Sequence, residues 1–385
     1  MRQTASIIST YTADVSGVCS ALFELGGMTV MHDASGCNST YNTHDEPRWY
    51  DTDSLVFLSG LSELEAVMGD DEKFIGDVTE AARELYPAFI ALAGTPIPMV
   101  IGTDFAALAS LIQQRTGIPT FGFATNGMHS YLSGASQAFA ALAEHLVQEP
   151  RERRKELSVN LLGVTPLDFS VGTMVDSLRR RLEAEGIAVA SCWAMGDSLE
   201  NICQAGQATV NLVVSWCGLA AAQVLRRRFG TPYAVGTPVG EAFTHVLAEE
   251  IRAAARDGQD RLPLTKRPPA GPGDLTLIAE SVTGGSLAAA MALEQGRRVR
   301  LVCPLETEDG FLLPGDLRAR DEVELEPLFK EAGGIIADPL YRPLCPPEVP
   351  FYELPHEAFS GRIYRRDIPD FIDHIPFFEE KRKRS

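Results

Sequence analysis

Residues 158–191, SVNLLGVTPLDFSVGTMVDSLRRRLEAEGIAVAS, contain the pattern on which the fold prediction rests. The run Ser158–Gly163 is apolar and predicts a buried strand, and Thr165-Pro166 then leads into an amphipathic stretch over residues 171–185. A second apolar run, Ile187–Ser191, follows this stretch. A strand, a helix and another strand in this order predict a crossover between two parallel strands.

The same unit recurs on both sides of this stretch. Further strands are expected at residues 28–31, 55–58, 89–93, 99–102, 120–123, 209–215, 275–279, 299–303 and 334–337. Helical patterns separate most of these runs, and Gly284-Gly285 is interpreted as a turn after a strand. The chain is therefore predicted to be an α/β protein with three doubly wound, Rossmann-like parallel-sheet domains around a central cleft.

Two segments of unusual composition predict the domain boundaries. Residues 149–156 are charged and contain a proline, and residues 267–273, RPPAGPG, have the composition of a linker. We therefore expect an N-terminal domain that carries the cysteines discussed below at residues 1–155, a second domain at 156–266, and a third domain with a C-terminal tail at 267–385.

Composition and charge exclude several classes of protein. Of the 385 residues, 45% are hydrophobic and 22% are charged, as in ordinary folded proteins. The 52 acidic and 34 basic residues give a net charge of −18, which repels phosphate backbones and anionic membranes. Neither a nucleic acid nor a membrane is expected as a partner.

The cysteines and the N-terminus predict the compartment. The first residues lack the apolar core of a signal peptide, and the seven cysteines show no CxxC spacing. We therefore expect a cytoplasmic protein without disulfides. The P-loop pattern G-x-x-x-x-G-K-[ST] and the dinucleotide pattern G-x-G-x-x-G are also absent, so neither ATP hydrolysis nor NAD binding is predicted for this chain.

Two cysteines lie where ligands often bind. Cys19, in the segment GVCSAL, is at or near a predicted helix N-terminus, where the helix dipole favours the thiolate. Cys37, in VMHDASGCNST, follows the strand predicted at 28–31, at a strand end where ligands gather in α/β sheets. Inert buried thiols are the alternative interpretation, although the polar neighbours of Cys37 argue against it.

Taken in order, the motifs resemble those of the catalytic component of nitrogenase and its relatives. That family includes dark-operative protochlorophyllide reductase, chlorophyllide reductase, a reductive cyclase of coenzyme synthesis and cofactor-assembly scaffolds. The matching motifs are Cys19, HDASGC at 32–37, VFLSG at 56–60, TPIPMVIGTD at 95–104, NLVVSWC at 211–217, RFGTPY at 228–233 and PVG at 238–240. The resemblance covers most of the chain.

The resemblance implies a particular metal site. The third cluster cysteine of the family would fall near Thr95, where this chain has none, so an eight-iron cluster is not expected. A cubane takes four thiolates, which implies a [4Fe–4S] cluster shared between two subunits and held by Cys19 and Cys37 of each. His32 and Gly36 match motif residues that adjoin the cluster cysteine and are expected beside the cofactor. For His32, a simple polar position at a strand end is an equal alternative.

A second metallocofactor in the cleft is a further implication of the resemblance. The cofactor cysteine of the family aligns with Ser215 rather than Cys217, and both residues are candidates for holding such a group. A purely structural role for Cys217 stays open. No counterpart of the family's C-terminal cofactor histidine is identifiable, so nitrogen fixation is not expected.

Three histidines are candidates for catalytic proton transfer. His44 lies in a polar loop after Cys37, and His129 and His356 follow predicted strands, where an interdomain pocket would collect them. A solvated loop position is the alternative for each histidine.

The resemblance implies the catalytic component of a nitrogenase-like, ATP-dependent reductase. A separate P-loop iron–sulfur ATPase would deliver electrons through the interfacial cluster to a substrate or metallocofactor in the cleft. The chain would act as a homodimer or as a heterodimer with a paralogue. Two alternatives stay open: a scaffold for assembling a complex iron–sulfur cofactor, and a metal-free α/β binding or transferase protein with both cysteines in its core.

Overall fold

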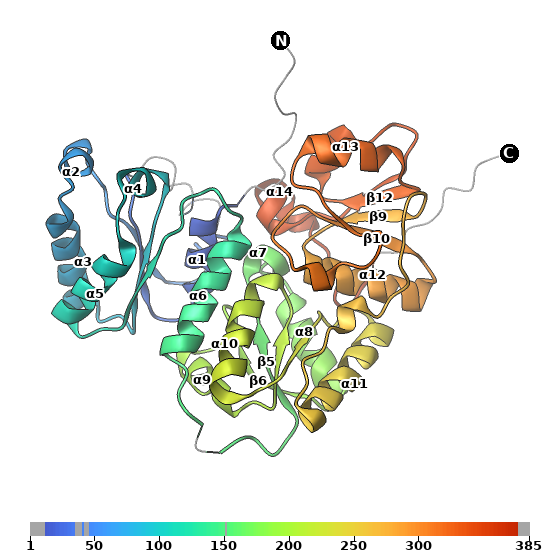
Figure 1. The fold of residues 1–385 in the computed structure, drawn as a ribbon, viewed down its shortest axis with the longest axis horizontal. Helices are drawn as coiled ribbons and strands as arrows, with labels where there is room; N and C mark the ends of the chain where they lie inside the picture. The colour runs from blue at the N-terminus through green and yellow to red at the C-terminus, as the bar shows by residue number, and fades with distance from the viewer. Residues whose placement is uncertain (1–11, 35–40, 42–45, 151, 376–385) are drawn as a thin grey trace, which may run out of the picture.

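A computed structural model describes residues 12–34, 41, 46–150 and 152–375. Its strands form three separate sheets in which every strand pairing is parallel. The predicted α/β class with three Rossmann-like sheets is confirmed. In chain order, we call the parts of the protein around these sheets the first, second and third units. Figure 1 shows the first unit at the left, the second below the centre and the third at the upper right.

The first sheet has the strand order β2-β1-β3-β4. Its strands are β1 (Met28–Met31), β2 (Leu55–Leu58), β3 (Ile90–Ala93) and β4 (Thr120–Phe123). Helices α1 (Asp14–Leu22) and α6 (Tyr131–His145) cover one face, and α3 (Asp71–Leu85) and α5 (Phe105–Thr116) cover the other. Alternation along β1 sends Met31 toward α1 and sends Met28 and Val30 toward α3.

Glycines bring α1 and α6 unusually close together. A Cβ on Gly17 would lie 2.0 Å from the carbonyl oxygen of Tyr131, and a Cβ on Gly134 would lie 1.8 Å from that of Asp14. Only glycine permits this approach of two backbones. The contact fixes the start of α6 beside α1 and thereby positions the Tyr131 side chain.

The strand predicted at residues 99–102 is wrong. Pro96–Ile101 form the short helix α4, which begins after Thr95 with a proline at its first position and ends at Gly102 with φ 79°. Proline at this position suits a helix start, and the left-handed glycine ends it. The apolar run that suggested a buried strand is instead largely exposed. Another short helix, α2 (Glu63–Met68), follows β2.

The second sheet has the order β6-β5-β7-β8. Its strands are β5 (Ser158–Leu162), β6 (Ala188–Cys192), β7 (Val210–Val213) and β8 (Tyr233–Val235). Its helices are α7 (Pro166–Phe169), α8 (Met174–Ala184), α9 (Leu199–Cys203), α10 (Leu219–Phe229) and α11 (Glu241–Asp257). The crossover predicted over 158–191 is confirmed, because β5 pairs in parallel with β6 after the helix α8.

The third sheet has the order β11-β10-β9-β12-β13. Its strands are β9 (Leu275–Ile278), β10 (Val299–Cys303), β11 (Leu317–Arg318), β12 (Gly334–Ala337) and β13 (Phe351–Glu353). Its helices are α12 (Ser281–Gln295), α13 (Glu322–Lys330) and α14 (Glu357–Tyr364). The turn predicted at Gly284-Gly285 is wrong, since both glycines are buried inside α12. A Cβ on Gly284 would lie 2.8 Å from Ala279 and Leu301, so glycine lets α12 pack closely on the sheet.

The units share apolar cores, and the end of the chain crosses between them. One cluster of buried side chains contains residues of all three units, and another joins the second and third. After α14 the chain returns to the second unit, where the carbonyl oxygen of Ile372 accepts a hydrogen bond from the Gly240 N–H at 2.9 Å. Asp373 pairs with Arg181 of α8 at 2.9 Å. This C-terminal segment, residues 368–375, therefore ties the second and third units together.

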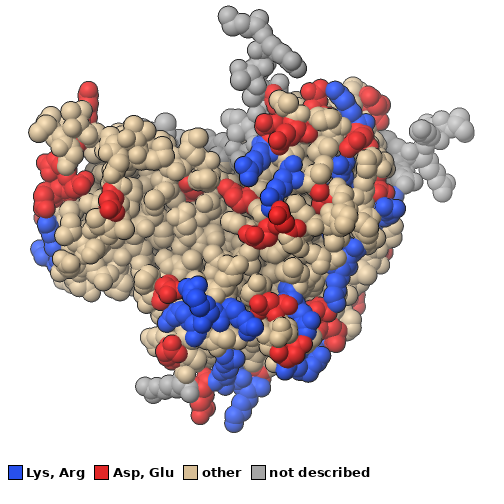
Figure 2. All heavy atoms as spheres, in the orientation of Figure 1, with Lys and Arg blue, Asp and Glu red and all other residues tan. Residues whose placement is uncertain are grey.

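The surface is unevenly charged. In the view of Figure 2, acidic and basic side chains crowd the lower part of the second unit, whereas uncharged atoms cover much of the first unit. None of the described helices has both the length and the apolar character needed to cross a bilayer.

Candidate active site between the second and third units

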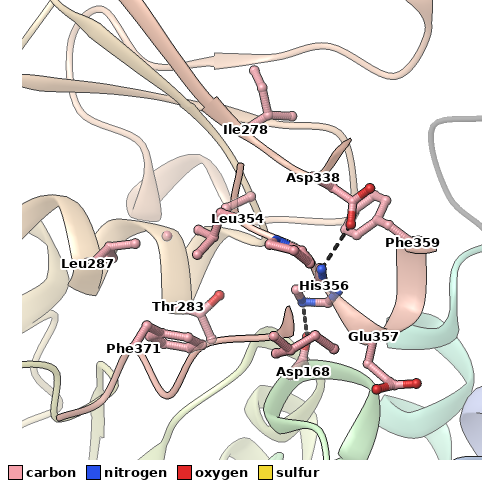
Figure 3. Close-up of a pocket in the computed structure, with 14 residues that line it drawn as sticks. Asp168, Ile278, Thr283, Leu287, Asp338, Leu354, His356, Glu357, Phe359 and Phe371 are labelled. Atoms are coloured by element: carbon pink, nitrogen blue, oxygen red, sulfur yellow. Dashed lines mark hydrogen bonds and ion pairs between the residues drawn. The ribbon is translucent and has the colours of Figure 1, made fainter. Parts of the chain in front are cut away.

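A pocket lies where strand ends of the second and third sheets meet (Figure 3). It is partly open to solvent and has a cavity volume of about 30 Å³. Its apolar wall is formed by Ile278, Leu287, Leu354, Phe359, Ile368 and Phe371. Its polar residues include Asp168, which follows β5, and Asp338 and His356, which follow β12 and β13. Ligands of open α/β sheets bind at such carboxyl ends of parallel strands.

The buried carboxylate of Asp168 joins side chains from all three units. The Tyr131 hydroxyl of α6 donates a short hydrogen bond to Oδ1, and the Ser215 hydroxyl donates to Oδ2 at 2.6 Å. His356 Nε2 lies 3.6 Å from Oδ1. Asp168 itself is 3% exposed, so these groups take the place of water around its charge. The three units therefore meet at a single carboxylate.

The hydrogen bonds of His356 indicate which ring nitrogen carries the proton. His356 precedes α14, and its Nδ1 accepts the N–H of Ala358 at 3.3 Å as a helix cap. A neutral ring with Nδ1 as acceptor holds its proton on Nε2. That Nε2 is buried at the pocket and forms no hydrogen bond with the residues that the structure describes. His356 thus presents an N–H group that Asp168 attracts and that a ligand can use.

Two further carboxylates hold His356 and α14 in place. Asp338 accepts the backbone N–H of His356 at 2.9 Å and the Ser360 hydroxyl at 2.6 Å. Glu357 pairs with Arg365 at 2.6 Å and accepts the Ser170 hydroxyl at 3.1 Å. Burial raises the pKa of Asp338, and its hydrogen bonds oppose that rise. Both acids act on the position of His356 and the helix that follows it.

Glu280 is a buried acid behind the pocket wall. Its carboxylate accepts the N–H groups of Val282 and Thr283 at 2.8 Å each, the Thr283 hydroxyl at 2.9 Å and the Trp216 N–H at 3.2 Å. Burial, and then the negative charge of Asp168, raise the pKa of Glu280 to about 7. Because Thr283 lines the pocket, its hydroxyl connects a group that exchanges a proton near neutral pH with the ligand space.

The structure brings three of the predicted site residues together. Ser215, Cys217 and His356 all belong to the surroundings of Asp168, and Ser215 Oγ lies 3.4 Å from Cys217 Sγ. Burial, and then the charge of Asp168, raise the pKa of the Cys217 thiol well above its ordinary value. Cys217 is therefore a neutral thiol beneath the pocket.

Two other predicted histidines lie elsewhere. His129 is exposed, and its Nδ1 lies 4.0 Å from Glu306. It does not line the pocket. His32 is on the face of the first sheet that α3 covers, where its ring lies 4.2 Å from that of Phe74 and its Nδ1 lies 2.8 Å from Ser59 Oγ. Cys19 packs on the opposite face, which separates His32 from that cysteine.

Cys19 differs in its setting from the expectation of an activated thiolate. It lies well inside α1, is completely buried, and has the carboxylate of Glu46 nearby. Burial first, and then that charge, raise the pKa of the Cys19 thiol. The structure therefore does not place Cys19 where the dipole of a helix N-terminus would favour its thiolate. Gly36, Cys37 and His44 lie outside the described residues.

The most informative acids were missed in the sequence. Asp168, Glu280 and Asp338 each follow a buried strand closely, in the segments VTPLDF, LIAES and IIADPL. An acid just past a buried strand faces the ligand edge of a parallel sheet, and this signal could have identified all three. Tyr131 carried no comparable signal, because its role depends on the contact between α1 and α6. Among the described residues, no group of three or more His, Cys, Asp or Glu is arranged to hold a metal ion.

Comparisons with curated proteins find partial matches. Over 193 residues the chain is 25% identical to one subunit of the light-independent protochlorophyllide reductase of Nostoc punctiforme, covering 48% of this chain and 38% of that protein. Over 137 residues it is 34% identical to the corresponding protein of Prosthecochloris aestuarii, covering 35% and 26%. Over 178 residues it is 24% identical to the nitrogenase iron-molybdenum cofactor biosynthesis protein NifE of Clostridium pasteurianum, covering 46% and 38%. The matches thus span less than half of each relative.

A solved structure and a family model extend the match. The structure titled "Nitrogenase Cp1 at pH 6.5" superposes with a TM-score of 0.67 at 15% identity, covering 96% of this chain and 91% of that one, which shows a shared fold. The family described as "Nitrogenase component 1 type Oxidoreductase" matches residues 16–268, well over half of the chain. The protein therefore belongs to the family of nitrogenase component 1 type oxidoreductases.

Proposed function

We propose that this chain is the substrate-binding component of a nitrogenase-like reductive system. An organic substrate would bind in the pocket between the second and third units, where Glu280 supplies a proton and the His356 Nε2–H donates a hydrogen bond as electrons arrive. The observation that carries this proposal is the His356 Nε2–H group, buried at the pocket and 3.6 Å from Asp168. An N–H aimed into a buried pocket is suited to donating a hydrogen bond to a substrate atom on which negative charge develops during reduction.

Proton supply and substrate orientation fall to different residues. The His356 Nε2–H points to the ligand space beside Asp168, because its Nδ1 accepts the Ala358 N–H. Glu280 exchanges its proton near neutral pH, and its contact with the pocket-lining Thr283 hydroxyl gives that proton a short route to the same space. Tyr131 and Ser215 fix the Asp168 carboxylate by donating hydrogen bonds to both of its oxygens.

The pocket lining favours an organic substrate over a metal cluster precursor. Its wall is largely aliphatic and aromatic, and its polar groups are carboxylates, one histidine and a threonine, with no cysteine among the described lining residues. Apolar walls with a few convergent polar groups are typical of small-molecule sites. A cofactor-assembly scaffold is the second candidate, because one of the matched relatives is named as a cofactor biosynthesis protein.

The [4Fe–4S] cluster shared between two subunits stays a prediction. Tyr41, four residues beyond Cys37 in the sequence, is buried in the same apolar cluster as Cys19. The two cysteines are donors of the type that such a cluster takes. Such a cluster, when bound, supplies single electrons at low potential. Cys19 is neutral and fully buried in the single chain, so binding iron requires loss of its proton and exposure of its sulfur.

The proposed partners are a second subunit and a P-loop iron–sulfur ATPase. Helices α2 and α4 expose apolar side chains beyond the first sheet, among them Leu64 at 71%, Val67 at 78% and Val100 at 77%. Exposed apolar side chains gathered on one surface are typical of protein contacts. We propose this surface of α2 and α4 for contact with the second subunit, whether a copy or a paralogue.

Turnover with defined components tests the proposal. Anaerobic protein is mixed with the cognate P-loop protein, ATP and dithionite, and is offered a porphyrin or a chlorin while absorbance is followed. We expect reduction only when both the P-loop protein and ATP are present. His356→Asn should lower the rate by roughly 10²- to 10³-fold, as for loss of a hydrogen-bond donor to the developing charge. His245→Asn, at an exposed histidine of α11, is the matched control and should behave like the wild type. Equal rates for wild type and His356→Asn would refute the role of the pocket.

A further inference from the structure

A cavity of about 200 Å³ lies in the first unit, apart from the pocket between the second and third units. It is lined mainly by apolar side chains of β1, β2 and α3: Met28, Val30, Phe57, Phe74, Val78 and Ala81. An apolar cavity of about 150 Å³ is large enough to hold benzene. This cavity therefore has room for a substituted aromatic ring.

Among the described residues, no helix covers this face of the sheet beside β2. β2 is the edge strand, and its pairing with β1 sets Phe57 opposite Val30, on the face that α3 and α5 cover elsewhere. Parallel strands are usually joined by a helix that would cover such a face. Of the described residues between β1 and β2, residues 47–51 form turns and none of 46–54 is helical. Phe57 is consequently 39% exposed beside the apolar side chains of α3.

One end of the cavity is polar. Ser59 and Asp77 line both the cavity and a smaller adjoining hollow that contains His32. His32 Nδ1 and Ser59 Oγ lie 2.8 Å apart, and the Ser59 hydroxyl also accepts the Asp33 N–H at 3.1 Å. Burial lowers the pKa of His32, so the ring is neutral and adds no positive charge.

The charge at this end is negative. Glu65, Asp70 and Asp77 line the adjoining hollow together with one cation, Lys73. Lys73 Nζ lies 2.6 Å from Glu65 Oε1, and this bond lowers the pKa of Glu65 to about 2. The positive charge of Lys73 is thus balanced by Glu65. The negative charge of Asp77, at the mouth of the cavity, is not balanced in this way. An ammonium group would be attracted there and a carboxylate repelled.

We propose that this cavity binds a small aromatic amine, with its ring between β2 and α3 and its ammonium group beside Asp77 and Ser59. The apolar lining favours an aromatic ring, and the volume limits the ligand to one or two fused rings. The acidic end of the cavity favours a positively charged group. The site is independent of the proposed reductase function, because it shares no residue with the pocket around Asp168.

Three probes of equal ring size test the selection of charge on the full chain. They are 2-phenylethylamine, 2-phenylethanol and 3-phenylpropanoate, titrated by calorimetry and by ligand-observed NMR. A ligand this small should bind with a Kd on the order of 1 mM. We expect the amine to bind about tenfold more tightly than the alcohol, and the carboxylate not to bind measurably. Equal binding of all three probes, or binding of none, would overturn the proposal.

Two variants locate the site, and a third serves as the control. Asp77→Asn removes an exposed charge without disturbing the core and should weaken amine binding by about tenfold while leaving the alcohol unchanged. Ala81→Phe fills the cavity and should abolish binding of amine and alcohol alike. Glu80→Gln lies on the same helix outside the cavity lining and should bind as the wild type does. A second protein chain is the rival occupant of the cavity. If Ala81→Phe changes the oligomeric state in sedimentation velocity but leaves amine binding unchanged, the cavity belongs to a protein contact and the proposal is overturned.

Discussion

The imidazole Nε2 of His356 lies 3.6 Å from Oδ1 of Asp168, joining a residue just past β13 of the third sheet to one just past β5 of the second. Each residue is held separately: Asp168 by Tyr131 and Ser215, and His356 by Asp338 and its own helix cap. The contact therefore depends on how the second and third units pack against each other. Substitutions that change this packing should alter the chemistry of the pocket even when the substituted residues do not line it.

Glu280 should make folding stability depend on pH. Its folded-state pKa of about 7 exceeds the ordinary value of 4.5, so the folded chain binds this proton more tightly than the unfolded chain. The resulting stabilisation is complete below pH 4.5 and is lost as the pH rises through 7, at up to about 1.4 kcal/mol per pH unit. Glu280→Gln should remove this slope. Urea denaturation at several pH values measures it, and Glu183→Gln, at an exposed position of α8, should retain the wild-type slope.

Two substitutions of His356 should separate its structural role from its chemical role. Asparagine can still cap α14, so His356→Asn should unfold with a free energy close to that of the wild type. His356→Ala removes the cap and should cost about 1 kcal/mol. Both variants lose the Nε2–H group and should lose turnover equally. If turnover falls only in His356→Ala, the variant with the lower free energy of unfolding, then His356 acts only as the cap of α14.

Iron content tests the predicted cluster. Two cysteines per chain satisfy a cubane only when two chains share it, so anaerobic protein should carry about four iron and four sulfide per dimer. Cys19→Ala and Cys37→Ala should each lose this iron. Cys217→Ser should keep its iron, because the Cys217 thiol lies near the pocket around Asp168, away from the first sheet. Full iron content in both Cys19→Ala and Cys37→Ala would contradict the predicted cluster and would mean that Cys19 is only a core residue.

The exposed surface of α2 and α4 should control assembly. Introducing lysines at Val67 and Val100 should shift the protein toward monomer in sedimentation velocity, with little change in its free energy of unfolding, because both side chains are exposed. Val323→Lys, on the exposed face of α13 at 72% exposure, is the control. An unchanged dimer in the double variant would place the subunit contact elsewhere.

The sequence predicted most strands because they are short, apolar and separated by helical patterns. It missed β8, β11 and β13, which are edge strands of only two or three residues. The run at 99–102 failed because apolar composition does not distinguish a buried strand from an exposed helix begun by Pro96. Gly284-Gly285 failed because glycine serves close packing as readily as it serves a turn. Each error concerns what surrounds a segment, and local pattern does not contain that information.

The candidate site was predictable only in part, for a related reason. His356 was found because it follows a strand, and Ser215 because it lies in a motif. Their common partner, Asp168, was missed, since its importance depends on the meeting of three units at one point. The charge that raises the pKa of Glu280 comes from that same distant residue.

The return of the C-terminal segment to α8 has a mechanical consequence. Ile368 and Phe371 belong to this segment and form part of the pocket wall. The contacts of Ile372 and Asp373 with the second unit therefore also hold that wall in place, next to the apolar core that the two units share. A substitution that loosened these contacts would loosen one side of the pocket.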